Sequence, residues 1–197
     1  MSDRVRTTIF GGTFNPIHNG HISIAESIMN SGLTDELWLL VTPRNPWKEG
    51  KELMPNDIRL KMAAQAVAHI PGVTASDYEF GLPIPSYTVN TLQSLTKDYP
   101  DREFILAIGA DNWTAFNKWK DYHYILANHK ILVYPRKGSE FVPTQIPGVT
   151  YIDFPLIDVS STMVMERIKL GLSVDGLIPD CVQEELQRMQ IYPPYDL

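Results

Sequence analysis

A pair of glycines and a pair of histidines stand close together near the N-terminus, in the segment IFGGTFNPIHNGH. Gly11 and Gly12 follow an apolar run, where glycine lets the backbone approach a ligand closely or turn with a positive φ. His18 and His21 are three residues apart, so they project to the same side of a helix that begins there. The unpaired N–H groups and partial positive charge of a helix start suit phosphate. The segment therefore predicts a phosphate-binding site.

Two other interpretations of the histidine pair stay open. A metal site would need a third or fourth protein ligand, and no nearby cysteine, aspartate or glutamate pattern supplies one. A structural pair would cap the helix and pack against it. The segment stands where a P-loop or a G-x-G-x-x-G fingerprint would stand, but it matches neither pattern. The flanking glycines and the position favour phosphate contact.

A second helix start carries hydroxyl groups at Ser160, Ser161 and Thr162, directly before an apolar-periodic segment. Serine and threonine are first a capping signal there, because their oxygens accept hydrogen bonds from the unpaired N–H groups of the first turn. Two helix starts that face each other would also suit a triphosphate.

The elements that must position these residues follow from apolar patterning. Short apolar segments predict strands at residues 7–10, 36–42, 73–76, 104–108, 131–134 and 151–154. Helical spacing predicts helices at residues 22–29, 57–70, 87–97, 161–170 and 179–189. Apolar strands that alternate with helices indicate a Rossmann-like, doubly wound α/β fold, with a parallel sheet covered by helices on both faces and a small C-terminal helical segment.

Sheets of this kind bind ligands beyond the carboxyl ends of their strands. The expected site therefore lies in the loops after the strands, at residues 11–20, 43–55, 109–119 and 135–143 and in the segment that leads to Ser160. Basic residues in these loops are expected to assist anion binding: Arg44, Lys48, Arg136 and Lys137.

Length, composition and charge set wider limits. With 197 residues, 44% hydrophobic and 20% charged, the chain is expected to form one globular domain, residues 1–197. A net charge of −6 disfavours nucleic-acid binding as the main function. No apolar run approaches the roughly 20 residues of a membrane span, and no signal-peptide core is present, so a cytoplasmic protein is expected. The single cysteine, Cys181, excludes an intramolecular disulfide and a cysteine-based metal site.

Several segments together resemble one enzyme family over nearly the whole chain. The first segment resembles the G-G-[ST]-F-[DN]-P-x-H-x-G-H signature of the nucleotidylyltransferase superfamily, and VSSTMVMERI resembles its I-S-S-T-x-I-R-x-x-I motif. SYTVNTL resembles the S-Y-T-x-D-T-L of the nicotinate-nucleotide adenylyltransferases, and IGADN followed by Trp119 resembles their G-x-D-N and tryptophan. The closing residues 178–192 are similar to that family, as is NPWK, although Trp47 stands where many members carry histidine.

The resemblance implies transfer of the adenylyl group of ATP to nicotinate mononucleotide, which gives deamido-NAD and pyrophosphate in NAD biosynthesis. The attacking phosphate monoester has a second pKa near 6, so it is largely ionised at neutral pH and needs no dedicated base. The enzyme then has to align the attack on the α-phosphate of ATP and stabilise the charge of the transition state, with Mg²⁺ shielding the departing pyrophosphate. The implied partners are these two small molecules, without a protein metal ligand, nucleic acid or membrane; a homo-oligomer stays open.

The matching motifs also imply a role for each site residue. The implied catalytic residues are His18, His21 and Lys48. The implied ATP contacts are the two histidines together with Gly11, Gly12, Thr13, Phe14, Gly109, Asp111, Ser160, Ser161 and Thr162. The implied contacts with nicotinate mononucleotide are Lys48, Tyr87, Thr88, Asp111, Trp119 and Arg136.

Selection of the acid over the amide has a physical rationale. A nicotinate carboxylate at the helix start near Tyr87 and Thr88 would accept backbone N–H bonds and gain from the helix dipole, whereas nicotinamide would present a neutral amide. Trp119 would stack on the pyridine ring. The alternatives are simple helix capping by Tyr87 and Thr88, and a core or surface position for Trp119.

Met165 departs from the family, because the motif has an arginine there that is expected to meet the β- and γ-phosphates. Arg167 is turned away by about 200° along the helix, and Lys169 lies about 6 Å farther from the helix start. Arg136 or Lys137 could approach from another loop. The sequence therefore predicts an active enzyme with altered triphosphate binding.

Other functions compete with this one. An adenylyltransferase could accept nicotinamide mononucleotide equally well, or transfer adenylyl or cytidylyl to another phosphorylated acceptor such as phosphopantetheine. A different class of function is a non-catalytic nucleotide-binding or regulatory module, in which Met165 in place of the motif arginine has weakened the site. The presence of His18, His21, Lys48 and Asp111 disfavours that module, since a sensor does not need the full donor set.

Overall fold

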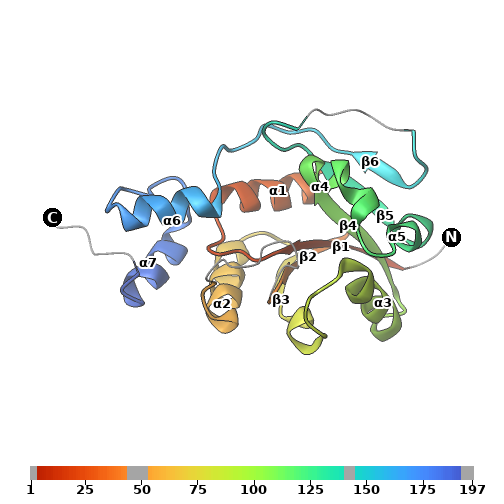
Figure 1. The fold of residues 1–197 in the computed structure, drawn as a ribbon, viewed down its shortest axis with the longest axis horizontal. Helices are drawn as coiled ribbons and strands as arrows, with labels where there is room; N and C mark the ends of the chain where they lie inside the picture. The colour runs from red at the N-terminus through yellow and green to blue at the C-terminus, as the bar shows by residue number, and fades with distance from the viewer. Residues whose placement is uncertain (1–3, 44–52, 140–144, 192–197) are drawn as a thin grey trace.

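The computed structural model describes residues 4–43, 53–139 and 145–191, in which six parallel strands form one sheet (Figure 1). The strands are β1 (Val5–Gly12), β2 (Glu36–Val41), β3 (Val73–Ser76), β4 (Arg102–Gly109), β5 (Lys130–Tyr134) and β6 (Val149–Tyr151). Their order across the sheet is β3-β2-β1-β4-β5-β6. The order reverses between β1 and β4, so the carboxyl ends of these two strands border the crevice in which such sheets bind ligands.

Helices follow most of the strands and connect each to the next. The α-helices are α1 (Asn19–Asn30), α2 (Asn56–Val67), α3 (Thr88–Asp98), α4 (Ala110–Thr114), α5 (Tyr122–Asn128), α6 (Ser161–Lys169) and α7 (Asp180–Arg188). Two short 3₁₀ helices are η1 (Tyr78–Gly81) and η2 (Phe116–Lys118). None of the helices in the described parts of the chain is both long and apolar enough to cross a bilayer.

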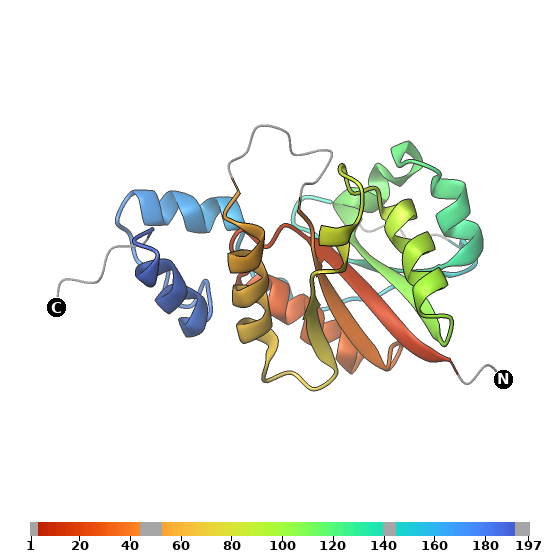
Figure 2. The ribbon, with the colours of Figure 1, turned by 90° about the horizontal axis from the view of Figure 1, so that it is seen from below.

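Two apolar cores lie on opposite faces of the sheet, because successive strand residues point to opposite sides. Along β4, Ala107 belongs to the first core, which α1, α2, α6 and α7 cover, whereas Ile108 belongs to the second core under α3 and α5. Figure 2 shows α1 and α2 on one side of the sheet and α3 and α5 on the other. The doubly wound sheet with helices on both faces is therefore confirmed.

The C-terminal helices α6 and α7 lie beyond the edge of the sheet, away from β6 (Figure 1). An ion pair joins them to the body of the protein: Lys61 of α2 lies 3.0 Å from Glu185 of α7, whose side chain is almost fully buried. Val182 and Leu186 of α7 are fully buried in the first core. The predicted small C-terminal helical segment is thus present.

All predicted strand and helix boundaries agree with the structure within three residues. Differences of three residues occur at the end of the sixth strand, which is Val149–Tyr151 and not residues 151–154, at the start of α1, which is Asn19 and not residue 22, and at the end of α2. One expectation was wrong. The segment 109–119, expected as a loop, contains α4 and η2, and α5 follows it without having been predicted. These helices are too short for a clear apolar period, and the burial of Phe116 and Ile125 in the second core stabilises them.

Candidate active site

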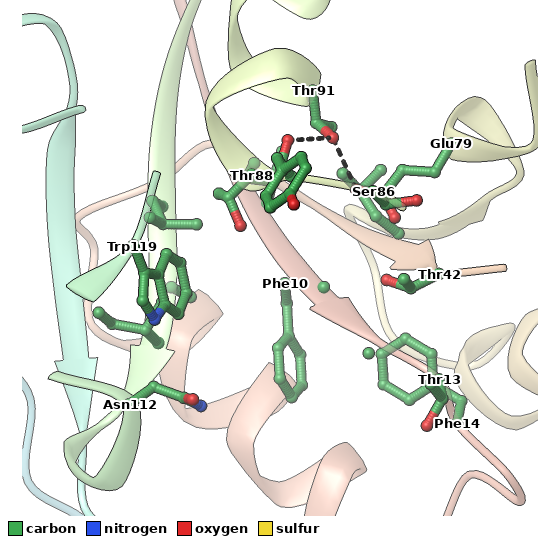
Figure 3. Close-up of a pocket in the computed structure, with 18 of the residues that line it drawn as sticks. Phe10, Thr13, Phe14, Thr42, Glu79, Ser86, Thr88, Thr91, Asn112 and Trp119 are labelled. Atoms are coloured by element: carbon green, nitrogen blue, oxygen red, sulfur yellow. Dashed lines mark hydrogen bonds between the residues drawn. The ribbon is translucent and has the colours of Figure 1, made fainter. Parts of the chain in front are cut away.

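A cavity of about 580 Å³ opens beyond the carboxyl ends of β1, β2 and β4. In Figure 3 Trp119 and Asn112 lie on one side of it, Thr42 and Glu79 on the other, and the ring of Phe10 between them. This is the edge of the sheet at which the sequence predicted the site. Eleven predicted site residues line it: Gly11, Gly12, Thr13, Phe14, His21, Tyr87, Thr88, Asp111, Trp119, Arg136 and Ser161.

The glycine pair ends β1 instead of forming a turn. Neither Gly11 nor Gly12 has a positive φ, which corrects that part of the expectation; the left-handed residue is Phe14, with a φ of 45°. A Cβ on Gly12 would lie only 2.9 Å from the Phe14 ring, so glycine leaves room for that ring. Gly11 has open space instead, because a Cβ there would meet nothing nearer than 4.0 Å. The expected close approach of a ligand to the backbone is therefore possible at Gly11.

The histidine rings come together, but only His21 lines the cavity. His18 is the N-cap of α1 with an extended backbone (φ −144°), so helical spacing does not apply to it. It is 3% exposed, and its ring stacks on that of His21 at 3.6 Å between centroids. The His18 backbone N–H donates to Nδ1 of His21 at 3.3 Å. The proton of a neutral His21 ring is therefore on Nε2, which makes that atom a donor.

His18 carries no charge at neutral pH. Burial lowers its pKa to about 4, and the nearby Arg136 guanidinium acts in the same direction. Its contribution to a phosphate site is therefore packing and hydrogen bonding, not positive charge. No cluster of three or more potential metal-ligating side chains exists among the described residues.

The stability of the protein is expected to depend on pH through His18. The folded state holds the pKa near 4, whereas the unfolded chain keeps the ordinary value of 6.5, so the unfolded chain takes up the proton first as the pH falls. The free energy of unfolding should be undiminished above about pH 6.5 and should fall by roughly 3 kcal/mol by pH 4 and below. Urea unfolding between pH 4 and 7 measures this loss.

His18→Asn should remove this part of the pH dependence, while the same change at the exposed His69 should preserve it. An unchanged pH slope in His18→Asn would contradict the assignment of the proton to His18.

A cluster around Gly109 borders the cavity at the end of β4. Asp111 Oδ1 lies 3.7 Å from Arg136 Nε, and both side chains line the cavity. A Cβ on Gly109 would overlap with that Asp111 oxygen and would lie 2.8 Å from Cγ of Arg136. Gly109 therefore does not line the cavity itself but makes space for the two charged side chains that do.

The start of α6 meets the loop after β1. Ser161 Oγ donates to the Pro16 carbonyl oxygen at 3.0 Å and also lines the cavity. Ser160 Oγ accepts from the Met163 backbone N–H at 3.1 Å, so the capping interpretation is confirmed for this residue. Thr162 is exposed and does not line this cavity.

A second, smaller hollow of about 220 Å³ adjoins the first at the start of α6. Both hollows share Asp111 and Arg136, and the smaller one is also lined by Lys137 and Ser160. The two cations suggested as substitutes for the missing arginine thus lie beside the helix start at which that arginine was expected. Lys137 there pairs with Asp158 at 2.5 Å.

The other end of the cavity carries the residues predicted to hold the acceptor. Tyr87 is the N-cap of α3, and Thr88 is the first residue of that helix. Trp119 is half-buried, 5.3 Å from the ring of Phe116, and presents part of its surface to the cavity. The predicted contact Lys48 lies outside the described residues, as do Trp47 and Arg44.

Sequence reasoning missed several polar residues that line the cavity: Thr42, Glu79, Ser86, Thr91, Asn112, Lys118 and Lys120. Glu79 is 6% exposed; Thr91 Oγ1 donates to its Oε1 at 2.8 Å, and burial raises the pKa of its carboxyl. A lone glutamate in a short 3₁₀ helix carries no sequence signal of burial. Lys118 and Lys120 did carry a sequence signal of a place near the site, since they flank Trp119, which was already assigned to it.

Arg59 is a second omission, and it supports the site from behind. Its side chain is fully buried, and its guanidinium donates to the Thr13 and Thr42 carbonyl oxygens at 2.6 and 2.9 Å. It also donates to the Met54 carbonyl and to the Asn56 side chain. One side chain therefore joins the loops after β1 and β2 to the start of α2. The sequence did carry a signal of this burial, because Arg59 stands among the apolar positions of the predicted helix 57–70.

Known proteins share both this sequence and this fold. The chain matches the cytidylyltransferase-like family over residues 9–167. A protein of Bacteroides fragilis named "Probable nicotinate-nucleotide adenylyltransferase" is 41% identical, over 93% of this chain and 92% of its own length. The chain belongs to the nicotinate-nucleotide adenylyltransferase family. A similarly named protein of Flavobacterium johnsoniae is 39% identical, over 93% of this chain and 97% of its own.

Solved structures agree with this membership at the level of the fold. The Plasmodium falciparum nicotinic acid mononucleotide adenylyltransferase complexed with NaAD has a TM-score of 0.82 to this chain, at 16% identity over 96% of this chain and 98% of its own. A putative nicotinate-nucleotide adenylyltransferase of Vibrio parahaemolyticus has a TM-score of 0.73 at 21% identity, over 97% of each chain. For a member of the adenylyltransferase family, the cavity at the switch point of the sheet is the expected active site.

Proposed function

We propose that this protein transfers the adenylyl group of ATP to nicotinate mononucleotide and releases pyrophosphate, in NAD biosynthesis. One observation carries the proposal: a single cavity of about 580 Å³ joins the glycine–histidine loop and the start of α6 to Tyr87, Thr88 and Trp119. The first set of groups suits a polyphosphate, and the second suits a pyridine ring with a carboxylate. Both substrates can therefore lie in one cavity with their phosphates together.

The reaction needs positioned donors more than a base. The acceptor phosphate is already largely ionised at neutral pH, so its oxygen attacks the α-phosphate of ATP as the bond to pyrophosphate breaks. His21 lines the cavity with its proton on Nε2, and it would donate to the α-phosphate as charge develops there. His18 holds the His21 ring from behind.

The nucleotide contacts follow from the places of the remaining residues. Thr13, Phe14 and the Gly11 backbone would lie against ATP, and Asp111 would border its adenosine, with Gly109 making room. Ser161, the Ser160 cap and Thr162 would present the start of α6 to the β- and γ-phosphates. Arg136 and Lys48 would assist with the acceptor phosphate, and Trp119 would stack on the pyridine ring.

Mg²⁺ would enter with ATP. Mg²⁺ prefers phosphate and water oxygens in substrate complexes, often with only one or two carboxylates. Among the described residues, Asp158 lines the smaller hollow at the start of α6, and no group of three potential metal ligands is present, so the phosphates would hold most of the ion's coordination sites. The bound ion would shield the charge of the departing pyrophosphate.

Met165, in place of the motif arginine, is half-buried against the first core and lines neither cavity. Arg136, which lines both hollows, would then serve the triphosphate as well as the acceptor phosphate, and Lys137 would add a second cation near the triphosphate. We expect Met165→Arg to lower the KM for ATP several-fold, because a guanidinium would add a charge-assisted donor. Leu170→Arg adds the same charge at the other, exposed end of α6 and should leave this KM unchanged. Unchanged KM and turnover in Met165→Arg would contradict the account.

We propose that residues 1–197 act in the cytoplasm as one catalytic domain. Self-association into a homo-oligomer stays a prediction that gel filtration with light scattering would test.

Pyrophosphate release tests the proposed function against its competitors. The protein is mixed with ATP and Mg²⁺, and the acceptor is nicotinate mononucleotide, nicotinamide mononucleotide or phosphopantetheine. We expect the highest kcat/KM with nicotinate mononucleotide. Equal rates with the amide would favour a dual-specificity enzyme, and the absence of pyrophosphate release with all three acceptors would favour the non-catalytic module.

A further inference from the structure

Two lysines flank Trp119 in the sequence Lys118-Trp119-Lys120, and all three residues line the cavity. Both lysine side chains are exposed, so their ammonium groups stay hydrated in the folded protein and are accessible to a ligand. Among the residues that the structure describes, neither lysine forms an ion pair with a carboxylate. The acceptor end of the cavity therefore carries two positive charges that internal partners do not neutralise.

Lys120 is the better placed of the two. Its Nζ lies 4.9 Å from the centre of the Tyr87 ring, which is within the range of a cation–π contact. Tyr87 caps α3, so the ammonium group is held beside the helix start whose N–H groups and partial positive charge also attract anions. The same group is one residue from Trp119, the proposed stacking partner of the pyridine ring.

The acidic residues of the cavity do not cancel this charge. Asp111 faces Arg136 at 3.7 Å, so its carboxylate already has a cationic neighbour. Glu79 is buried against Thr91, and burial raises the pKa of its carboxyl, which favours its neutral form. Net positive potential therefore remains near Lys120.

We propose that Lys120 binds the carboxylate of the nicotinate ring and is the residue that makes the enzyme prefer the acid over the amide. With the ring stacked on Trp119, a carboxylate beside the start of α3 would accept a charge-assisted hydrogen bond from the ammonium group. A carboxamide at the same place is neutral and gains little from a cation. The Tyr87 ring holds the ammonium group near this position when no acceptor is bound. This inference rests on the proposed function.

The test compares kcat/KM for nicotinate mononucleotide and nicotinamide mononucleotide in Lys120→Gln. We expect a loss of roughly 10- to 100-fold with the acid, mainly through KM, because a hydrogen bond to a charged group is removed. With the amide we expect a change of less than about threefold, so the selectivity ratio falls. Lys120→Arg, which keeps the charge, should retain most of the ratio.

Lys97→Gln is the matched control, since it removes one exposed lysine from the other end of α3 and should leave the ratio unchanged. Three results would overturn the proposal: an unchanged ratio in Lys120→Gln, an equal loss with both acceptors, or a larger fall in the ratio for Lys118→Gln. Thermal unfolding confirms that each variant is folded. A wild-type protein inactive with both acceptors would refute the proposed function instead, so the two failures are distinguishable.

Discussion

Replacing Arg59 by methionine is expected to lower the free energy of unfolding by roughly 3–5 kcal/mol. The change leaves the carbonyl oxygens of Met54, Thr13 and Thr42 buried without their donor, although it also removes a charge that is costly to bury. Burial lowers the pKa of the guanidinium, which shows that burying its charge carries a cost. We expect the loss of its hydrogen bonds to exceed the relief of that cost, so the variant should be less stable. Urea unfolding monitored by circular dichroism measures the loss.

The same variant is expected to lose activity, because the Thr13 carbonyl belongs to the loop that would hold ATP. Arg59→Lys keeps the charge but not the fork of donors, so we expect a smaller loss of stability and a partial recovery of kcat. Arg4→Met, at an exposed position near the N-terminus, should change the unfolding free energy by no more than about 0.5 kcal/mol. A stable Arg59→Met protein with normal kcat would contradict the positioning role.

His21→Asn is expected to lower kcat about 10²- to 10³-fold, with a smaller change in the KM for ATP. The reason is the loss of a donor fixed in place by the His18 amide and by ring contacts with Phe14 at 4.9 Å between centroids. Because the donor is most effective when charge develops on the α-phosphate, its removal should affect the transition state more than substrate binding. Steady-state pyrophosphate release gives both constants.

His69→Asn is the control for His21, because His69 is exposed and does not line the cavity. It should retain the wild-type kcat. If His21→Asn kept kcat and only raised the KM for ATP, His21 would be a ground-state binding residue and the proposed catalytic role would be wrong.

The order of strands and helices followed from sequence because each element is long enough to show its period. Strand 104–108 is uniformly apolar, as a strand covered on both faces must be, and it is the centre of β4. The region from 110 to 128 gave no such signal. Its helices α4, η2 and α5 have five, three and seven residues, and contacts of Phe116 and Ile125 with the second core stabilise them.

The lining of the cavity was predictable where a motif fixes both residue type and backbone place, as at His21, Thr88 and Asp111. The buried residues that hold the loops around the cavity were not predictable, because their roles depend on contacts between distant segments. Arg59 joins residues up to 46 positions away, and no local pattern encodes such a partner. His18 shows the limit of spacing arguments: it precedes the helix in an extended conformation, so its ring lies behind His21 and not beside it in the cavity.

The fate of the α-phosphate tests the central claim most directly. The protein is incubated with Mg²⁺, nicotinate mononucleotide and ATP labelled with ³²P at the α-position, and the products are separated by chromatography. The proposed reaction predicts that the label appears in nicotinate adenine dinucleotide, in step with release of unlabelled pyrophosphate. Label that stayed in ATP, or that appeared in AMP without any dinucleotide, would contradict adenylyl transfer to this acceptor.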